Sequence, residues 1–101
     1  MPQLEIQQWE RYEGENSWTW AVWIEGPEAA LDQIAFVEWT LHPTLPNPIR
    51  KVRDRETKFR LEITGLGAFP VIARVQLKDG KQSKLHHYLK LHYPDGRDSK
   101  A

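Results

Sequence analysis

One alternating, tryptophan-rich run restricts the fold of this chain more than any other feature. In the run SWTWAVWIE, every second residue is large and apolar, and these residues are Trp18, Trp20, Val22 and Ile24. A period of two is typical of a β-strand, and tryptophan and β-branched residues favour the pleated surface of a sheet. The run therefore predicts a strand that buries its tryptophan-bearing face.

Further runs with strand character follow the same logic, and turn signals separate them. Strands are expected within residues 4–12, 34–41, 59–64, 69–78 and 84–93. Gly26-Pro27 ends the first strong strand before at most one helical turn, and Asp79-Gly80 predicts a hairpin of type I′. About 7–8 short strands without a long helix predict an all-β, immunoglobulin-like antiparallel β-sandwich. We expect this domain to span residues 1–93, with a flexible tail over 94–101.

The expected strands differ in how clearly they define a buried face. In residues 34–41 one face holds Ala35, Val37, Trp39 and Leu41, whereas the alternation in residues 4–12 is disturbed and indicates a bulge. Trp39 and Trp23 can each be core residues or face solvent. A solvent-facing tryptophan would mark a binding surface, because a large exposed aromatic ring is unfavourable without a partner.

Charge and composition exclude several classes of protein. The 101 residues carry 14 Lys plus Arg and 14 Asp plus Glu, and this zero net charge argues against direct nucleic-acid binding. Without cysteine there is no disulfide and no thiolate chemistry, and no apolar run reaches the roughly 20 residues of a membrane helix. A cytoplasmic location is expected, or a nuclear one in a eukaryotic source.

The zero net charge hides a division between the two halves. Residues 1–48 hold eight acidic side chains and one basic one, a net charge of −7, whereas residues 49–101 hold thirteen basic and six acidic ones, a net charge of +7. The basic run Arg50, Lys51, Arg53 and Arg55 either favours an acidic partner or forms a solvated face on which Asp54 and Glu56 pair locally.

No motif of catalysis, metal binding or cofactor binding is present. His86 and His92 share a strand face but lie about 20 Å apart along an extended chain, too far to bind one ion. The serines lack a GxSxG setting, and no phosphate-binding GxxxxGK[ST] occurs. We therefore expect a non-enzymatic protein without a metal or cofactor.

Two loop segments are the best site candidates. Prolines stiffen residues 41–48, LHPTLPNP, and residues 65–69, GLGAF, are rich in glycine, which permits unusual backbone angles and exposes backbone N–H groups. Loops at the same end of a sandwich lie close together, and recognition commonly occurs there. His42 can either contact a ligand or hold its own loop through a backbone carbonyl.

These two motifs, in this order, resemble those of the YEATS domain family, and of its prokaryotic branch in particular. The resemblance runs from about residue 18 to 91 and includes WAVWIEGPEAAL, LHPTLPNP and FRLEITGLGAF. It implies an immunoglobulin-like sandwich that recognises a ligand without catalysis. In eukaryotic members the two loops form a channel for an acylated lysine, whose flat amide lies between two aromatic rings.

The resemblance also assigns residues to the site. It implies that His42, Thr44, Leu45, Gly65, Leu66 and Gly67 form the ligand-binding pocket, with Thr44 supplying a hydroxyl. Phe69 matches the frame of the second loop. Leu45 stands where the family usually has Phe, and Leu66 where it has Trp or Tyr, so both rings of the aromatic cage are missing.

The expected partner is a protein or peptide, with an acylated lysine as the ligand that the family suggests. Loss of two stacking rings weakens such binding by about 1–3 kcal/mol. The alternative is a protein-interaction or scaffold domain that keeps the sandwich, docks through a sheet face or edge, and does not bind acyl-lysine.

Overall fold

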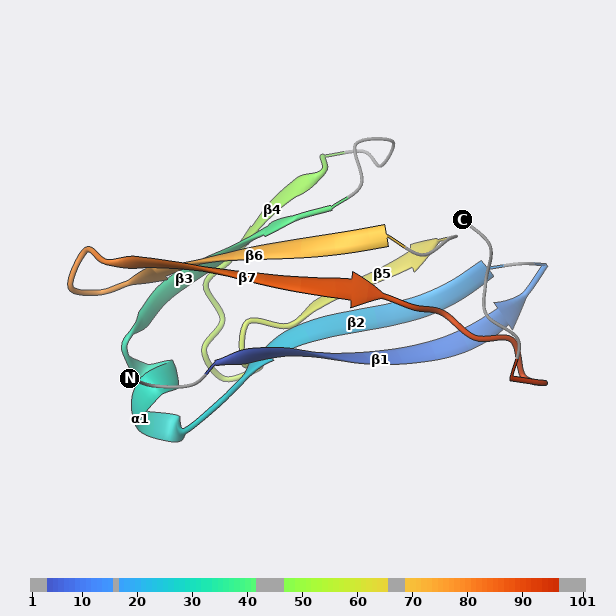
Figure 1. Cartoon of the computed structure of the whole chain (residues 1–101), viewed down its shortest axis with the longest axis horizontal. Helices are drawn as coiled ribbons and strands as arrows, with labels where there is room; N and C mark the ends of the chain where they lie inside the picture. The colour runs from blue at the N-terminus through green and yellow to red at the C-terminus, as the bar shows by residue number, and fades with distance from the viewer. Residues whose placement is uncertain (1–3, 16, 42–46, 66–68, 97–101) are drawn as a thin grey trace.

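The protein is a two-layer β-sandwich (Figure 1). The computed structural model describes residues 4–15, 17–41, 47–65 and 69–96, and in these ranges seven strands form two antiparallel sheets. The strands are β1 (Glu5–Gly14), β2 (Ser17–Glu25), β3 (Ile34–Thr40), β4 (Ile49–Val52), β5 (Leu61–Gly65), β6 (Phe69–Leu77) and β7 (Gln82–Leu89). A short helix, α1 (Glu28–Asp32), joins β2 to β3. The all-β sandwich predicted from the sequence is confirmed.

The two sheets exchange strands along the chain. The first sheet has the order β1-β2-β5, and the second has the order β4-β3-β6-β7. The chain crosses between them after β2, after β4 and after β5, so each sheet contains strands from both halves of the chain. Antiparallel pairing places the ends of β3 and β5 at the same end of the sandwich as the beginnings of β4 and β6 (Figure 1).

The tryptophan face of β2 is buried as the alternation predicts. Trp18, Trp20, Val22 and Ile24 are each at most 1% exposed and lie between the sheets. Opposite them, alternate residues of β3 and β6 complete the core, and these are Val37, Trp39, Val71, Ala73 and Val75. Burial of this apolar surface is the main stabilising term in such a domain.

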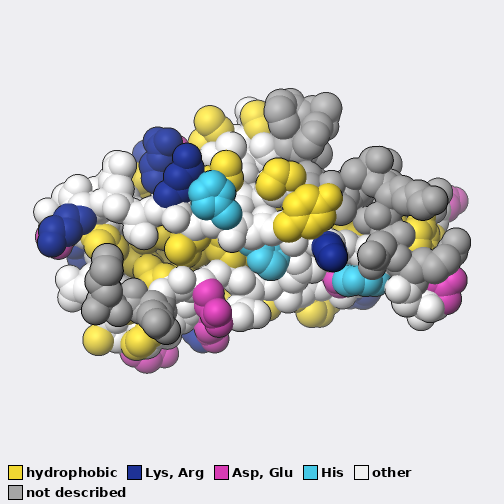
Figure 2. Space-filling view, viewed as in Figure 1, with side chains coloured by type: hydrophobic (Ala, Val, Ile, Leu, Met, Phe, Trp, Pro, Cys, Tyr) yellow, Lys and Arg dark blue, Asp and Glu magenta, His cyan; other side chains and the backbone are white. Residues whose placement is uncertain are grey.

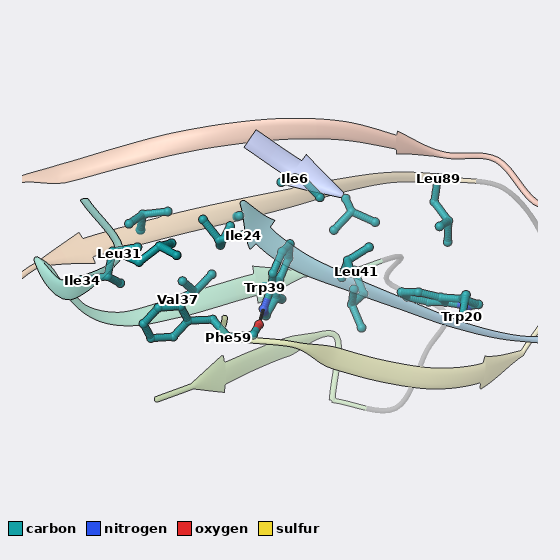
Figure 3. Close-up of a cluster of buried hydrophobic side chains, with 14 of the residues drawn as sticks. Ile6, Trp20, Ile24, Leu31, Ile34, Val37, Trp39, Leu41, Phe59 and Leu89 are labelled. Atoms are coloured by element: carbon teal, nitrogen blue, oxygen red, sulfur yellow. Dashed lines mark hydrogen bonds between the residues drawn. The ribbon is translucent and has the colours of Figure 1, made fainter. Parts of the chain in front are cut away.

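Trp39, whose environment the sequence left open, is a core residue. Its side chain is fully buried, and its indole Nε1 donates a hydrogen bond of 3.0 Å to the backbone oxygen of Phe59. Figure 3 shows these two residues meeting in the centre of the core. The bond satisfies an indole N–H and a carbonyl that water cannot reach.

Phe59 ends the crossover from the second sheet to the first in an uncommon conformation. Lys58 and Phe59 both have positive φ angles, 59° and 60°, which bulky residues rarely adopt. Backbone bonds from Lys58 N to Arg55 O and from Phe59 N to Asp54 O close this turn. The turn directs the Phe59 ring into the core, where it is fully buried. Burial of the ring offsets a backbone strain of about 1–3 kcal/mol.

The structure corrects several details of the sequence prediction. Residues 49–52 form β4, where only a charged run was expected, because pairing with β3 outweighs the weak strand propensity of Arg50 and Lys51. A register shift between Ile34 and Phe36 places Ile34 in the core instead of Ala35. In the hairpin at Asp79-Gly80 only Gly80 has a positive φ, so the turn is not type I′.

The bulge expected within residues 4–12 is absent there. β1 pairs regularly with β2 from Glu5 to Tyr12, and its register shifts only between Tyr12 and Gly14. The alternation is disturbed because two inward positions, Gln8 and Glu10, are polar. They lie where β1 approaches β7, and both make hydrogen bonds to residues that follow β7.

These polar residues hold the two sheets together along the β1–β7 side. Gln8 Nε2 donates to the backbone oxygen of Lys90 at 2.8 Å, and Gln8 Oε1 lies 2.6 Å from His87 Nε2. Glu10 accepts a hydrogen bond from the backbone N–H of His92, and its other oxygen lies 3.1 Å from His92 Nδ1. Partial burial beside β1 lowers the pKa of His87 below its ordinary value of 6.5.

Replacing Trp39 by phenylalanine should destabilise the fold strongly. The variant leaves the buried Phe59 carbonyl without its donor and opens a small cavity, which together lower the free energy of unfolding by about 2–4 kcal/mol. Urea denaturation followed by circular dichroism measures this loss. Trp9→Phe is the matched control, because Trp9 is 38% exposed and its loss should matter much less. Equal effects of the two substitutions would contradict the role given to Trp39.

The lowered pKa of His87 predicts a pH dependence of stability. As pH falls below 6.5, the unfolded chain binds a proton at this position before the folded protein does, so protonation favours unfolding. The His87→Gln variant should therefore lose less Tm than the wild type between pH 7.5 and a pH about two units lower. His86→Gln serves as the control, since His86 is exposed on the opposite face of β7. Parallel pH profiles for wild type and His87→Gln would contradict the prediction.

Candidate functional site

The sequence places the candidate site in two loops, and the structure describes their bases. Of the six expected pocket residues only Gly65 lies within the described residues, at the end of β5. His42, Thr44, Leu45, Leu66 and Gly67 lie outside them.

The strands that carry the loops are neighbours at one end of the second sheet. Thr40, the last residue of β3, pairs with Ile72, which is three residues after the beginning of β6 at Phe69. Three extended residues span about 10 Å. The end of β3, where the first loop begins, and the start of β6, where the second loop ends, are therefore about 10 Å apart.

The base of the first loop is fixed by two hydrogen bonds. The backbone N–H of Leu41 donates to the oxygen of Pro48 at 2.7 Å, which brings the two ends of the loop together. Arg50 Nε donates to the oxygen of Asn47 at 2.6 Å, and Asn47 has a positive φ of 49°. Leu41 itself is buried, so the loop begins from a position that core packing holds.

The base of the second loop stands on a buried aromatic group. Gly65 pairs with Trp18 in the first sheet, and the ring of Trp18 packs edge-on against those of Tyr12 and Tyr93, at centroid distances of 5.1 and 5.0 Å. Trp18 Nε1 also donates to the backbone oxygen of His92 at 2.8 Å. Because Tyr12 and Tyr93 come from opposite ends of the chain, sequence spacing gave no signal that they meet here.

Gly65 is not a glycine for the reason that the sequence suggested. Its φ lies outside the left-handed region, and a Cβ built on it would meet no atom within 4 Å. At this position of the second loop, neither backbone conformation nor packing in the described protein requires a glycine.

Ion pairs join the acidic first half of the sequence to the basic second half. Five ion pairs join an acid of residues 1–48 to a base of residues 49–101: Arg55 with Glu28 and with Asp32, Lys58 with Glu25, Arg74 with Glu38, and His92 with Glu10 when the ring is protonated. The local pairing expected of Asp54 and Glu56 is not formed with any described base, because Arg55 turns to α1 instead.

The described part of the chain contains no cluster of three or more His, Asp or Glu side chains that could hold a metal ion. In the same residues no helix is long and apolar enough to cross a membrane. The features of the candidate site that the structure describes are the bases of its two loops, the aromatic rings below the second loop and the surface charge.

Comparisons with known proteins agree with this architecture. The model of the prokaryotic YEATS domain matches residues 18–90. The Protein AF-9 homolog of Eremothecium gossypii is 33% identical over 95 residues, which cover 84% of this chain and 44% of the relative. The chain thus spans less than half the length of that relative.

Solved structures of the yeast AF-9 homolog Yaf9 share the fold. The crystal structure of the protein has a TM-score of 0.69 at 24% identity, covering 89% of this chain and 66% of that one. The Yaf9 YEATS domain recognising an H3K122suc peptide has a TM-score of 0.65 at 24% identity, covering 90% and 70%. The domain bound to H3K27ac has a TM-score of 0.67 at 22% identity, covering 98% and 80%.

The match of the family model covers both loop bases, the buried tryptophan strand β2 and most of the two sheets. By this match, the chain belongs to the family of prokaryotic YEATS domains.

Proposed function

We propose that the protein is a non-catalytic recognition module that binds an acylated lysine, or another peptide ligand, between its two loops. The observation that carries the proposal is the family membership, together with the adjacency of the strands that lead into the loops. Yaf9 domains of the same fold recognise a peptide carrying H3K122suc and bind H3K27ac. These are peptides whose lysine side chain is acylated.

In this proposal the pocket consists of His42, Thr44, Leu45, Gly65, Leu66 and Gly67. The hydroxyl of Thr44 donates to the acyl carbonyl, and a backbone N–H of the second loop holds the same amide. Leu45 and Leu66 replace the two rings of the family's aromatic cage with aliphatic walls. Such walls bury the methylene groups of an acyl chain but give no stacking energy, so binding is weaker than in a domain with two rings.

Neither the backbone conformation nor the packing requires a glycine at position 65, and this supports a role for Gly65 in the approach of a ligand. The backbone at position 65 would accept a residue with a side chain, but the residue present is glycine. The end of β5 beside the second loop therefore carries no side chain. A ligand can then lie close to the backbone there, as it commonly does at glycine positions. The alternative function, a scaffold that does not bind acyl-lysine, gives no such reason for Gly65.

Titration with lysine peptides tests the proposal directly. Peptides carrying acetyl-, crotonyl-, succinyl- or unmodified lysine are added to ¹⁵N-labelled protein, and chemical shifts are followed at the loop residues. One or more acylated peptides should bind measurably more tightly than the unmodified one. Thr44→Ala should weaken that binding by about five- to tenfold, the loss of one hydrogen bond, whereas Ser83→Ala on β7 should not.

A second variant in the same titration tests the degenerate cage. Leu66→Trp restores one ring and should raise affinity for a crotonyl peptide by about two- to twelvefold, whereas Leu66→Ile, which adds no ring, should not. Identical, flat responses to all four peptides in both wild type and Leu66→Trp would remove the acyl-lysine function.

Substitution of Gly65 separates ligand approach from folding. Gly65→Ala should keep or raise the free energy of unfolding by up to about 1 kcal/mol, because alanine restricts the unfolded chain and fits the native backbone. The same variant should lose affinity for the peptide that binds wild type best. Gly80→Ala is the control: its φ of +93° makes alanine strained, so it should lose stability but not affinity. A stable Gly65→Ala protein with unchanged affinity would place the ligand elsewhere.

A further inference from the structure

The outer face of the second sheet presents two different rows of side chains. Residues that point away from the core on β4, β3, β6 and β7 lie side by side through their pairing. Near the loop end, Ile49 and Ile72 share one row with Thr40 and His86, and Pro70 and Tyr88 form the next row toward the loops; these four apolar side chains are the apolar strip. Two residues further from the loops, Lys51, Arg74 and Lys84 share a row with Glu38, and together with Arg53, which follows β4, they form the basic strip.

The apolar strip is unusually exposed. Ile49 is 58% exposed and Tyr88 is 56% exposed, and among the described residues Trp9 is the one other large hydrophobic residue that is exposed. Figure 2 shows apolar side chains gathered over this face beside a group of Lys and Arg side chains. Trp9, on the outer face of the first sheet, differs because the guanidinium groups of Arg11 and Arg60 lie against its ring.

The basic strip carries an excess of positive charge. Its four bases face one acid, Glu38, so the charge is four minus one, or +3. Glu38 is 3.8 Å from Arg74, a loose contact with an exposed guanidinium. Lys51 and Arg53 lie over the ring of Phe36 instead, at 4.5 and 5.6 Å from its centroid.

This charge is available to a partner. In residues 4–15, 17–41, 47–65 and 69–96, no carboxylate lies within ion-pair distance of Lys51, Arg53 or Lys84. Arg55 of the basic run, and Lys58 beyond it, are paired with acids of the first half. The outer face of the second sheet therefore holds positive charge that folding does not cancel.

We propose that this face binds an extended acidic segment of another protein, in which acidic and apolar side chains alternate. Neighbouring strands lie about 4.8 Å apart, so the strips run about 14 Å across the four strands, the length of four to five extended residues. On β4 and β6 the strips lie two residues apart, about 7 Å, from Ile49 to Lys51 and from Ile72 to Arg74, whereas on β7 Tyr88 lies four residues, about 13 Å, from Lys84. A segment that lies between them directs alternate side chains to the apolar strip and to the basic strip.

A protein segment fits this face better than nucleic acid does. The whole chain has no net charge, whereas nucleic-acid binding depends on an excess of basic residues. The exposed Ile49 side chain also gives a phosphate backbone nothing to bind, whereas apolar side chains of a peptide bury it. Complementary charge then favours acidic partners over basic ones.

The face is separate from the acyl-lysine pocket proposed above. Ile49 and Pro70 follow the two loops in sequence, so the apolar strip begins where the loop bases end, but none of the six proposed pocket residues belongs to either strip. The two functions can therefore succeed or fail independently.

Fluorescence anisotropy with short labelled peptides tests the proposal. The probe is a peptide of about eight residues in which aspartate alternates with leucine and valine, and its comparison peptide carries lysine in place of each aspartate. A labelled random-sequence DNA duplex is the third probe. The acidic peptide should bind at low salt, the basic peptide and the DNA should bind at least about tenfold more weakly, and the binding should weaken as salt rises.

Variants locate the contact. Arg74→Glu combined with Lys84→Glu should weaken binding of the acidic peptide by at least about tenfold, and Ile49→Ser by about threefold or more. Lys81→Glu, in the exposed β6–β7 turn, is the matched control and should leave affinity within about twofold. Thr44→Ala should leave it unchanged, which keeps the test distinct from that of the acyl-lysine pocket.

Three results would overturn the proposal. They are no binding of the acidic peptide at about millimolar concentration, equal effects of Lys81→Glu and the Arg74/Lys84 double variant, and preferential binding of the DNA duplex. The variants at Arg74, Lys84, Ile49 and Lys81 replace exposed side chains, so circular dichroism should show wild-type folding in them.

Discussion

The contact between Trp39 and Phe59 holds the two sheets in one arrangement. Trp39 lies in the centre of the second sheet, and Phe59 ends the crossover that leads to the first. One hydrogen bond and two fully buried rings join them. A turn with two positive φ angles is stable only because this burial repays its strain. Through that turn the contact also sets where β5 begins, and β5 leads directly to the second loop.

The crossovers between the sheets also decide which charged side chains lie next to each other. Acids of the first half and bases of the second half are far apart in sequence, but strand exchange brings Glu25, Glu28 and Glu38 next to Lys58, Arg55 and Arg74. Exposed pairs of this kind contribute little to stability, with a median of about 0–1 kcal/mol. Their effect is on the surface: they neutralise one region and leave positive charge on the outer face of the second sheet, where recognition of an acidic partner is favoured.

The fold and the family were accessible from the sequence, and the detailed surface was not. Alternation identified β2 and its buried tryptophans, and two loop motifs indicated the YEATS family. β4 escaped notice because Arg50 and Lys51 have low strand propensity, and pairing with β3 alone makes them a strand. Gln8 and Glu10 disturbed the pattern of β1 because they face the β7 side, a contact that no local rule contains. Of the six pocket residues, Gly65 alone is described, so the pocket remains a proposal.

The sequence by itself determined which residues avoid water and where the chain must turn, because those preferences act over a few residues. It thereby determined a β-sandwich. Only the tertiary structure decided which distant residues meet. It placed Trp39 against Phe59, put Tyr12 and Tyr93 around Trp18, and paired acids of the first half with bases of the second. These contacts depend on the order in which strands join two sheets, and that order is a property of the whole chain.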